Sequence, residues 1–250
     1  MNLYKLIATE NDCYKTGRKI KPTGIMWHST GANNPNLRRY VGPDDGRLGI
    51  NPYRNYWNRS GLSKCVHAFI GKLKDGSIAT YQILPWDHRG WHAGGAANNT
   101  HISFEICEDG LNDKAYAMAV YREAVELSAY LCKMFGIDPM AKNAIIDHKE
   151  GNRLGIASNH KDVLHWFGRY DITLDKIRRD IKAEMTEKPA PAPEPKPARR
   201  VVRLEAGTPI YPTPPPDWVE ADGKYTIVEE VNGWGRLLSG RGWVSLPEVK

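Results

Sequence analysis

The 250-residue chain has few cysteines, and their spacing excludes several kinds of site. It contains four, Cys13, Cys65, Cys107 and Cys132, and no two of them form a CxxC pair. Zinc sites built from cysteine pairs and thioredoxin-like redox motifs are therefore absent. Cys107 and Cys132 lie in apolar segments, where a free thiol behaves as a small hydrophobic side chain. We expect both in the core and neither on a metal.

Long apolar runs are also missing. No stretch approaches the roughly 18 apolar residues of a membrane-spanning helix, so we expect no membrane insertion. Residues 1–17 lack a charged segment followed by an apolar run, and no secretory signal is visible. We therefore expect synthesis in the cytoplasm, a reducing compartment that suits free cysteines.

The chain has no large excess of charge. Its net charge is +6, with 41% hydrophobic and 26% charged residues, an ordinary balance for a soluble globular protein. Residues 187–250 contain nine Lys/Arg and nine Asp/Glu, so the whole excess lies in residues 1–186. A mild basic excess suits an anionic polymer such as a cell wall or a nucleic acid. It is too small and too scattered to identify the polymer.

Two predicted strands carry polar side chains of interest. Thr23–His28 is a compact apolar run that ends in His28, as a buried strand does when it delivers a functional residue; a histidine bonded to backbone is the alternative. His101–Cys107 is a strong strand that contains Glu105 between apolar neighbours. A carboxylate there costs free energy unless it is paired or functional. Alternation places Ser103 and Glu105 together on a polar face.

Other segments predict the scaffold and carry no assigned chemistry. Spacings of three and four between apolar residues predict amphipathic helices, and a turn sequence between two apolar runs predicts a hairpin. The predicted elements are an edge strand or lead-in at Leu3–Ala8, a long loop at Ala32–Gly49, a short helix start at Arg54–Asn58, hairpin strands at Cys65–Ile70 and Ser77–Leu84, a long helix at Asn112–Phe135 and a last helix capped by Thr173.

The stretch Asp147–Phe167 concentrates possible metal ligands. It contains His148, His160, Asp162 and His165, and imidazole and carboxylate are suitable ligands for Zn²⁺. Several Gly, Ser and Asn residues and the lack of a sustained helical period predict a loop after a short strand. A surface loop with solvated histidines is the alternative interpretation of this stretch alone.

A second loop, Asp87–Ala97, is rich in glycine, histidine and tryptophan. Trp91 and His92 on such a loop suit contacts with a sugar or a peptide. A loop packed for structural reasons is the alternative.

The last quarter of the chain changes in composition. Glu187–Arg200 alternates proline with other residues, which favours a semi-rigid polyproline II spacer between domains. Val201–Lys250 has short strand candidates separated by turn sequences, together with Trp218, Trp234 and Trp243. This pattern predicts a small all-β, SH3-like barrel that acts as a binding module, with a structural cap as the alternative.

Taken together, these motifs resemble one family. WHSTG at 27–31, VHAFIG at 66–71, GWHAGG at 90–95, ISFEICEDG at 102–110 and HKEG to SNHKD between 148 and 162 resemble the zinc N-acetylmuramoyl-L-alanine amidases of the type-2 amidase and peptidoglycan-recognition-protein superfamily. The resemblance covers roughly residues 20–185. GWGRLLSGRGWV at 233–244 resembles a bacterial SH3-type wall-binding domain.

The resemblance implies a fold and a set of roles. The expected fold is an α/β domain with a mixed β-sheet flanked by helices. By position, His28, His148 and Asp162 would bind Zn²⁺, with His165 competing for the third ligand position. Glu105 would be the catalytic glutamate and His160 the second catalytic group. His67, Trp91 and His92 would line a groove for glycan and stem peptide.

The resemblance also implies an architecture and a partner. We expect a catalytic domain at 1–186, a linker at 187–200 and a wall-binding domain at 201–250. This is the plan of a phage endolysin, which acts on bacterial peptidoglycan after holin-type release from the cytoplasm. The alternatives are a non-catalytic peptidoglycan-binding protein and a zinc or HNH-like nuclease. The chain lacks the basic cluster with interleaved aromatics that nucleic acid would require.

Overall fold

In the computed structural model the chain divides into two compact units, Met1–Thr186 and Glu187–Lys250. The structure describes residues 1–186 throughout and then residues 200–203, 209–210, 219–220, 224–231, 234–237 and 243–245. The predicted linker at 187–200 lies outside the described residues up to position 199.

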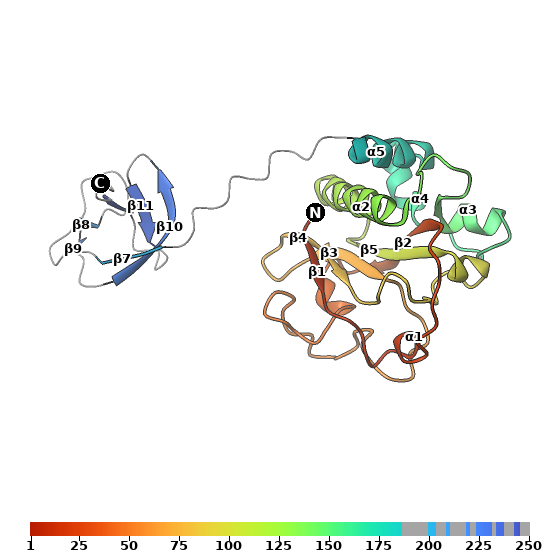
Figure 1. The fold of residues 1–250 in the computed structure, drawn as a ribbon, viewed down its shortest axis with the longest axis horizontal. Helices are drawn as coiled ribbons and strands as arrows, with labels where there is room; N and C mark the ends of the chain where they lie inside the picture. The colour runs from red at the N-terminus through yellow and green to blue at the C-terminus, as the bar shows by residue number, and fades with distance from the viewer. Residues whose placement is uncertain are drawn as a thin grey trace. The chain divides into compact units, whose positions relative to one another are not determined.

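The first unit is built on a six-stranded mixed sheet (Figure 1). The strand order is β1-β4-β3-β5-β2-β6, in which β3 and β4 form an antiparallel hairpin and the other neighbours run parallel. The strands are β1 (Leu3–Lys5), β2 (Gly24–Asn33), β3 (Ala68–Lys72), β4 (Ile78–Gln82), β5 (His101–Glu108) and β6 (Ile145–Asp147). The predicted hairpin and the predicted strands around His28 and Glu105 are confirmed.

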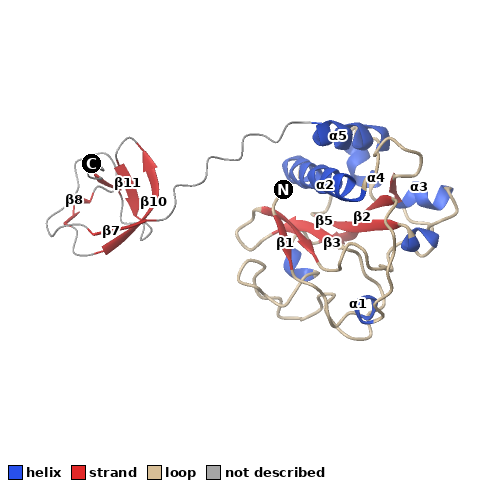
Figure 2. Ribbon diagram, in the orientation of Figure 1, coloured by secondary structure: helices blue, strands red, loops and turns tan. Residues whose placement is uncertain are grey.

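Two long helices, α2 (Lys114–Phe135) and α5 (Leu174–Thr186), cover one face of this sheet (Figure 2). The side chain of Asp113 caps α2 by accepting the backbone N–H of Tyr116 at 3.0 Å, and Gly136 ends it in the left-handed conformation. The apolar faces of both helices pack on the sheet in the main hydrophobic core. A mixed sheet flanked by helices is the fold class that the sequence predicted.

Loops and short helices cover the opposite face. Among them are α1 (Asp12–Lys15), η1 (Leu37–Arg39) and η2 (Ala96–Asn99). A second apolar cluster lies here, in which the ring of Phe69 stacks on Tyr40 at 5.0 Å and meets Trp57 edge-on at 4.9 Å. Cys13, Cys65 and Cys107 are buried in this cluster, whereas Cys132 is buried in the main core.

The structure corrects two sequence predictions. No helix forms at Arg54–Asn58; Arg54 has φ 48°, a left-handed conformation that interrupts a right-handed helix. The predicted loop at Asp147–Phe167 contains two short helices, α3 (His148–Arg153) and α4 (Leu164–Phe167), followed by η3 (Gly168–Tyr170). Asp147 nucleates α3 because its side chain accepts the backbone N–H of Glu150 at 2.7 Å.

The second unit is described through its strands. β10 (Lys224–Val231) pairs antiparallel with β7 (Arg200–Arg203) and β11 (Trp234–Leu237), β11 pairs with β12 (Trp243–Ser245), and β8 (Pro209–Ile210) pairs with β9 (Val219–Glu220). Ile227, Leu237 and Val244 are buried. The predicted turns at 232–233 and 239–240 and Trp218 lie outside the described residues, and the SH3-like barrel stays a prediction.

Across the described part of the chain, we find no helix that combines the length and the apolar character needed to span a bilayer.

Candidate functional site

The candidate site begins with two neighbouring strands. Trp27 in β2 points into the core under α2, where its indole N–H donates to Ser128 Oγ at 3.0 Å. His28 follows it, so alternation places His28 on the opposite face. The register pairs His28 with Glu105 of β5, and both therefore leave the sheet side by side. Ser103 lies two residues earlier on the same polar face, as the sequence predicted.

The other two candidate ligands come from the segment after β6. His148 is the first residue of α3 and is buried, while Asp162 lies just before α4. The backbone N–H of His148 donates to the carbonyl of Asp162 at 3.0 Å. This bond closes the segment into a loop whose two ends meet beside His28.

Three potential ligand atoms converge at this point. Nδ1 of His28 lies 3.1 Å from Oδ2 of Asp162 and 3.2 Å from Nδ1 of His148, and the last two atoms are 3.6 Å apart. Ligands of a tetrahedral Zn²⁺ with bonds of about 2.0–2.1 Å lie about 3.3 Å from each other. The spacing and the two-imidazole, one-carboxylate set fit a zinc ion. Within the described residues this is the one cluster of its kind.

The protonation states of this cluster also suit a metal. Burial raises the pKa of Asp162, but hydrogen bonds with His148 and His28 outweigh it, and the net pKa is lowered. Burial lowers the pKa of His28, although Asp162 opposes this effect. Near neutral pH the carboxyl is therefore ionised and the His28 imidazole is neutral, which are the forms that bind metal.

Glu105 has the environment of a proton acceptor. Burial raises its pKa well above the ordinary value, and the negative charges of Asp162 and Glu108 raise it further. Its Oε2 is buried and accepts no hydrogen bond from any described residue. A carboxyl group with a raised pKa and a free oxygen beside the ligand cluster can take up a proton and release it again.

The two remaining histidines of the segment lie in different places. His160 is exposed; its Nδ1 lies 3.0 Å from Ser158 Oγ, which in turn lies 3.1 Å from Nε2 of the buried His148. His165 sits in α4 with its Nε2 3.2 Å from Oε1 of Glu108. The structure therefore brings Asp162 into the ligand cluster and places His165 outside it.

Two loop residues that we expected to line a groove, His92 and Trp91, differ in burial and position. His92 is half-buried and adjoins the cluster, with Nδ1 3.0 Å from Nε2 of His28. Trp91 is 49% exposed, and the guanidinium of Arg89 lies 4.9 Å above its ring. Both remain candidates for substrate contact, His92 beside the ligand cluster and Trp91 at the solvent-facing side of the loop.

His67 does not line a groove, contrary to what the sequence had led us to expect. It is fully buried, accepts the backbone N–H of Ser103 through Nδ1 at 3.0 Å, and donates through Nε2 to the carbonyl of His88 at 2.8 Å. Both ring nitrogens are used within the protein, so His67 has none to offer a substrate. We assign it a structural role between β5 and the Asp87–Ala97 loop.

Sequence reasoning missed three residues around the cluster. Ser158 links His148 to His160; Asn98 accepts the backbone N–H groups of His92 and Ala93 at 2.9 Å each; Glu108 contacts His165. Ser158 and Asn98 lie in segments rich in small polar residues and have no sequence signal of their own. Glu108 follows Glu105 by three residues, and a second acid at the end of an apolar strand was a usable signal.

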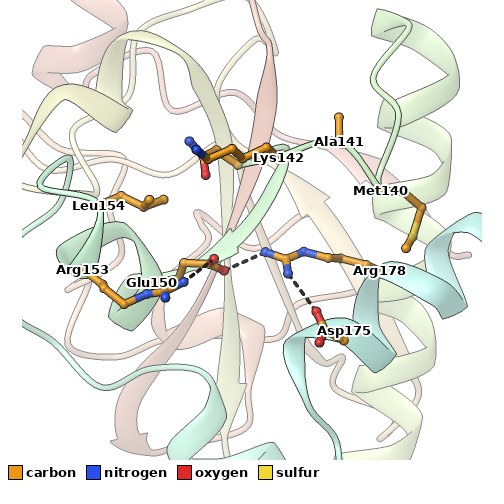
Figure 3. Close-up of a pocket in the computed structure, with 9 residues that line it drawn as sticks. Met140, Ala141, Lys142, Glu150, Arg153, Leu154, Asp175 and Arg178 are labelled. Atoms are coloured by element: carbon orange, nitrogen blue, oxygen red, sulfur yellow. Dashed lines mark hydrogen bonds and ion pairs between the residues drawn. The ribbon is translucent and has the colours of Figure 1, made fainter.

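A cavity of about 460 Å³ lies elsewhere, between α3 and α5 (Figure 3). None of its lining residues belongs to the ligand cluster. The guanidinium of Arg178 crosses it, bonding to the Ile145 carbonyl at 2.8 Å, to Glu150 at 2.7 Å and to Asp175 at 3.0 Å. Arg178 thus covers the free edge of β6 and its charge is neutralised there, so we assign the cavity no ligand.

The burial of His67 predicts a loss of stability in acid. Burial lowers its pKa from 6.5 to about 4, despite the opposing bond to His88. Between these values the unfolded chain binds a proton at His67 that the native protein does not. The free energy of unfolding should therefore fall by roughly 3 kcal/mol from pH 6.5 to pH 4 on account of this residue. The free energy of unfolding, measured by urea denaturation at several pH values in this range, should change less with pH in His67→Gln than in the wild type.

An equal pH dependence in the two proteins, or an NMR titration of native His67 near pH 6.5, would contradict this prediction.

Comparisons with known proteins give the family and the fold of this chain. The family model described as N-acetylmuramoyl-L-alanine amidase (Amidase_2) matches residues 18–163, more than half of the chain. No curated protein sequence matches. Three similar solved structures share the fold, each covering most of the chain. They are Staphylococcus aureus hydrolase AmiA in complex with its ligand (17% identity, 74% of this chain and 82% of that chain, TM-score 0.53), the PlyG catalytic domain (18%, 76% and 99%, 0.52) and PlyL (18%, 72% and 96%, 0.50). On the extent of the family match, the chain belongs to the N-acetylmuramoyl-L-alanine amidase family.

Proposed function

We propose that this chain is a zinc-dependent peptidoglycan amidase. It hydrolyses the amide bond between the lactyl group of N-acetylmuramic acid and the first L-alanine of the stem peptide. One observation carries the proposal: His28, His148 and Asp162 converge at ligand spacing beside the partner-free carboxyl oxygen of Glu105. Family membership supports the same substrate and the same bond.

His28, His148 and Asp162 would hold the metal. Three protein ligands leave one tetrahedral position open, the arrangement of catalytic zinc sites. Bound zinc supplies a Lewis acid that polarises a carbonyl and lowers the pKa of water to about 7.

Glu105 and His160 supply the proton transfers and the charge stabilisation. Glu105 accepts a proton from the attacking water through Oε2 and delivers it to the alanine nitrogen as the C–N bond breaks. Its raised pKa favours the protonated state that the second step requires. His160 donates a hydrogen bond to the oxyanion that develops on the lactyl carbonyl. His92 and Trp91 contact the glycan or the stem peptide beside the reacting bond.

The second unit completes the proposal. We infer an endolysin-like plan in which an SH3-like domain at 201–250 binds the wall and the linker at 187–200 tethers it. Cytoplasmic synthesis, release through a phage holin and action on the wall belong to this plan. The support is the composition of the linker and the tryptophan-rich, short-strand pattern of the tail.

Digestion of purified peptidoglycan tests the reaction. The protein should release new N-terminal alanine and no reducing sugar ends, because it cuts an amide bond and leaves the glycan intact. A chelator should abolish release and added zinc should restore it. New reducing ends would identify a glycosidase and reject the site. Wall binding without any release would favour a non-catalytic peptidoglycan-binding protein.

Single substitutions test the roles of the site residues. His28→Ala should lose zinc and activity together, since it removes a ligand. Glu105→Gln should keep one zinc per chain and lose about 10²–10⁴ in rate, and His160→Ala should keep zinc and lose about 10²–10³. Zinc content by atomic absorption and rates on the same preparations separate these classes. If His160→Ala loses zinc while Asp162→Ala keeps it, the ligand assignment is wrong.

Deletion of residues 201–250 tests the tail. The truncated chain retains the whole first unit, which has its own hydrophobic cores, and should keep its rate on soluble wall fragments. Its sedimentation with intact walls should drop. Unchanged sedimentation would show that the tail is not the targeting module.

A further inference from the structure

A second acidic residue of β5, Glu108, contacts segments on both sides of the candidate metal site. Glu108 is buried, and its Oε1 accepts the hydroxyl of Ser29 at 2.6 Å and lies 3.2 Å from Nε2 of His165. Its backbone N–H donates to Thr30 Oγ1 at 3.1 Å. One residue thus contacts two segments that are far apart in the sequence.

The first segment is the end of β2. The register between β2 and β5 is regular through His28 and Ser29 and then shifts before Asn33. The two hydroxyl contacts of Glu108 lie where this backbone ladder is interrupted. They join β2 to β5 immediately after His28, across the irregularity between the Ser29–Ile106 and Asn33–Glu108 pairs.

The second segment is α4. His165 lies three residues after Asp162, and α4 begins two residues after that ligand. The His165 side chain is 31% exposed to solvent, whereas the Glu108 side chain that it meets is 6% exposed. Burying a carboxylate is costly unless it is paired, so Glu108 favours the arrangement in which His165 stays docked.

We propose that Glu108 and His165 are positioning residues for the metal site: the Glu108 carboxylate joins the segment that carries His28 to the segment that carries Asp162 and so holds these two ligands at bonding separation. The inference rests on the proposed zinc site. Residues that orient metal ligands typically contribute about 10–100-fold to metal affinity, because the ligands need less ordering when the metal binds.

Glu123 offers a matched control. It is also a buried glutamate, and its Oε1 accepts the hydroxyl of Thr80 at 2.8 Å and the backbone N–H of Asn2 at 2.9 Å. It lies on α2 against β4 and contacts none of the candidate ligands. Glu123→Gln therefore makes the same chemical change as Glu108→Gln away from the site.

Zinc affinity of the full chain, measured by competition with a chromogenic chelator, tests the proposal. Glu108→Gln and His165→Ala should each weaken zinc binding by about tenfold or more, and Glu123→Gln by less than about twofold. The double variant Glu108→Gln/His165→Ala should bind zinc no more weakly than the weaker-binding single variant, since both changes break the same Glu108–His165 contact. His165→Lys places a cation opposite Glu108 and should recover most of the affinity. Thermal melting of the metal-free proteins checks that all of them fold.

The outcomes separate this inference from the proposed function. Glu108→Gln matching Glu123→Gln in zinc affinity, or His165→Ala matching wild type, overturns the positioning role even if the wild type is an active amidase. Weakened zinc binding in both site variants, with no alanine released from peptidoglycan by the zinc-loaded wild type, supports the positioning role and rejects the amidase. A wild-type chain that binds no zinc overturns both.

Discussion

The parallel pairing of β2 with β5 is the constraint on which the candidate site depends. Side chains alternate along a strand, so the register that sets His28 beside Glu105 also sends Trp27 and Phe104 into the core under α2, with ring centroids 5.2 Å apart. A slip of β2 by one residue would bury His28 under the helix and turn the Trp27 indole out of the core. The hydrophobic core therefore determines where the polar site can form.

The same arrangement concentrates charge in a small volume. Asp162, Glu105 and Glu108 are close enough that the first and the last raise the pKa of the second, in addition to its burial. Bringing these acids and neutral imidazoles together makes folding less favourable at this place, as is common at functional sites. A divalent cation among these groups would relieve the repulsion, and this gives the zinc proposal a physical reason beyond ligand spacing.

Predictions succeeded where the determining interactions are local. The helix α2 has an apolar repeat, a capping aspartate and a terminal glycine within its own sequence, and the β3–β4 hairpin has its turn between two apolar runs. Predictions failed where neighbours in space decide. The segment after β6 closes through the bond from the backbone N–H of His148 to the carbonyl of Asp162. The missed helix α3 is an exception with a local cause, because the adjacent Asp147 caps it. His67 resembles a surface ligand in sequence but lies at 0% exposure with both nitrogens bonded.

The sequence by itself determined the kinds of residue available for chemistry, their order along the chain and the alternation that sets Glu105 on a polar face. It also determined the long helices, because their periodicity and caps are encoded within one segment. Only the tertiary structure decided that Asp162 and not His165 joins His28 and His148, and that Glu108 contacts both flanking segments. Those distances arise from the packing of strands and helices that lie far apart in the chain, and no local pattern specifies them.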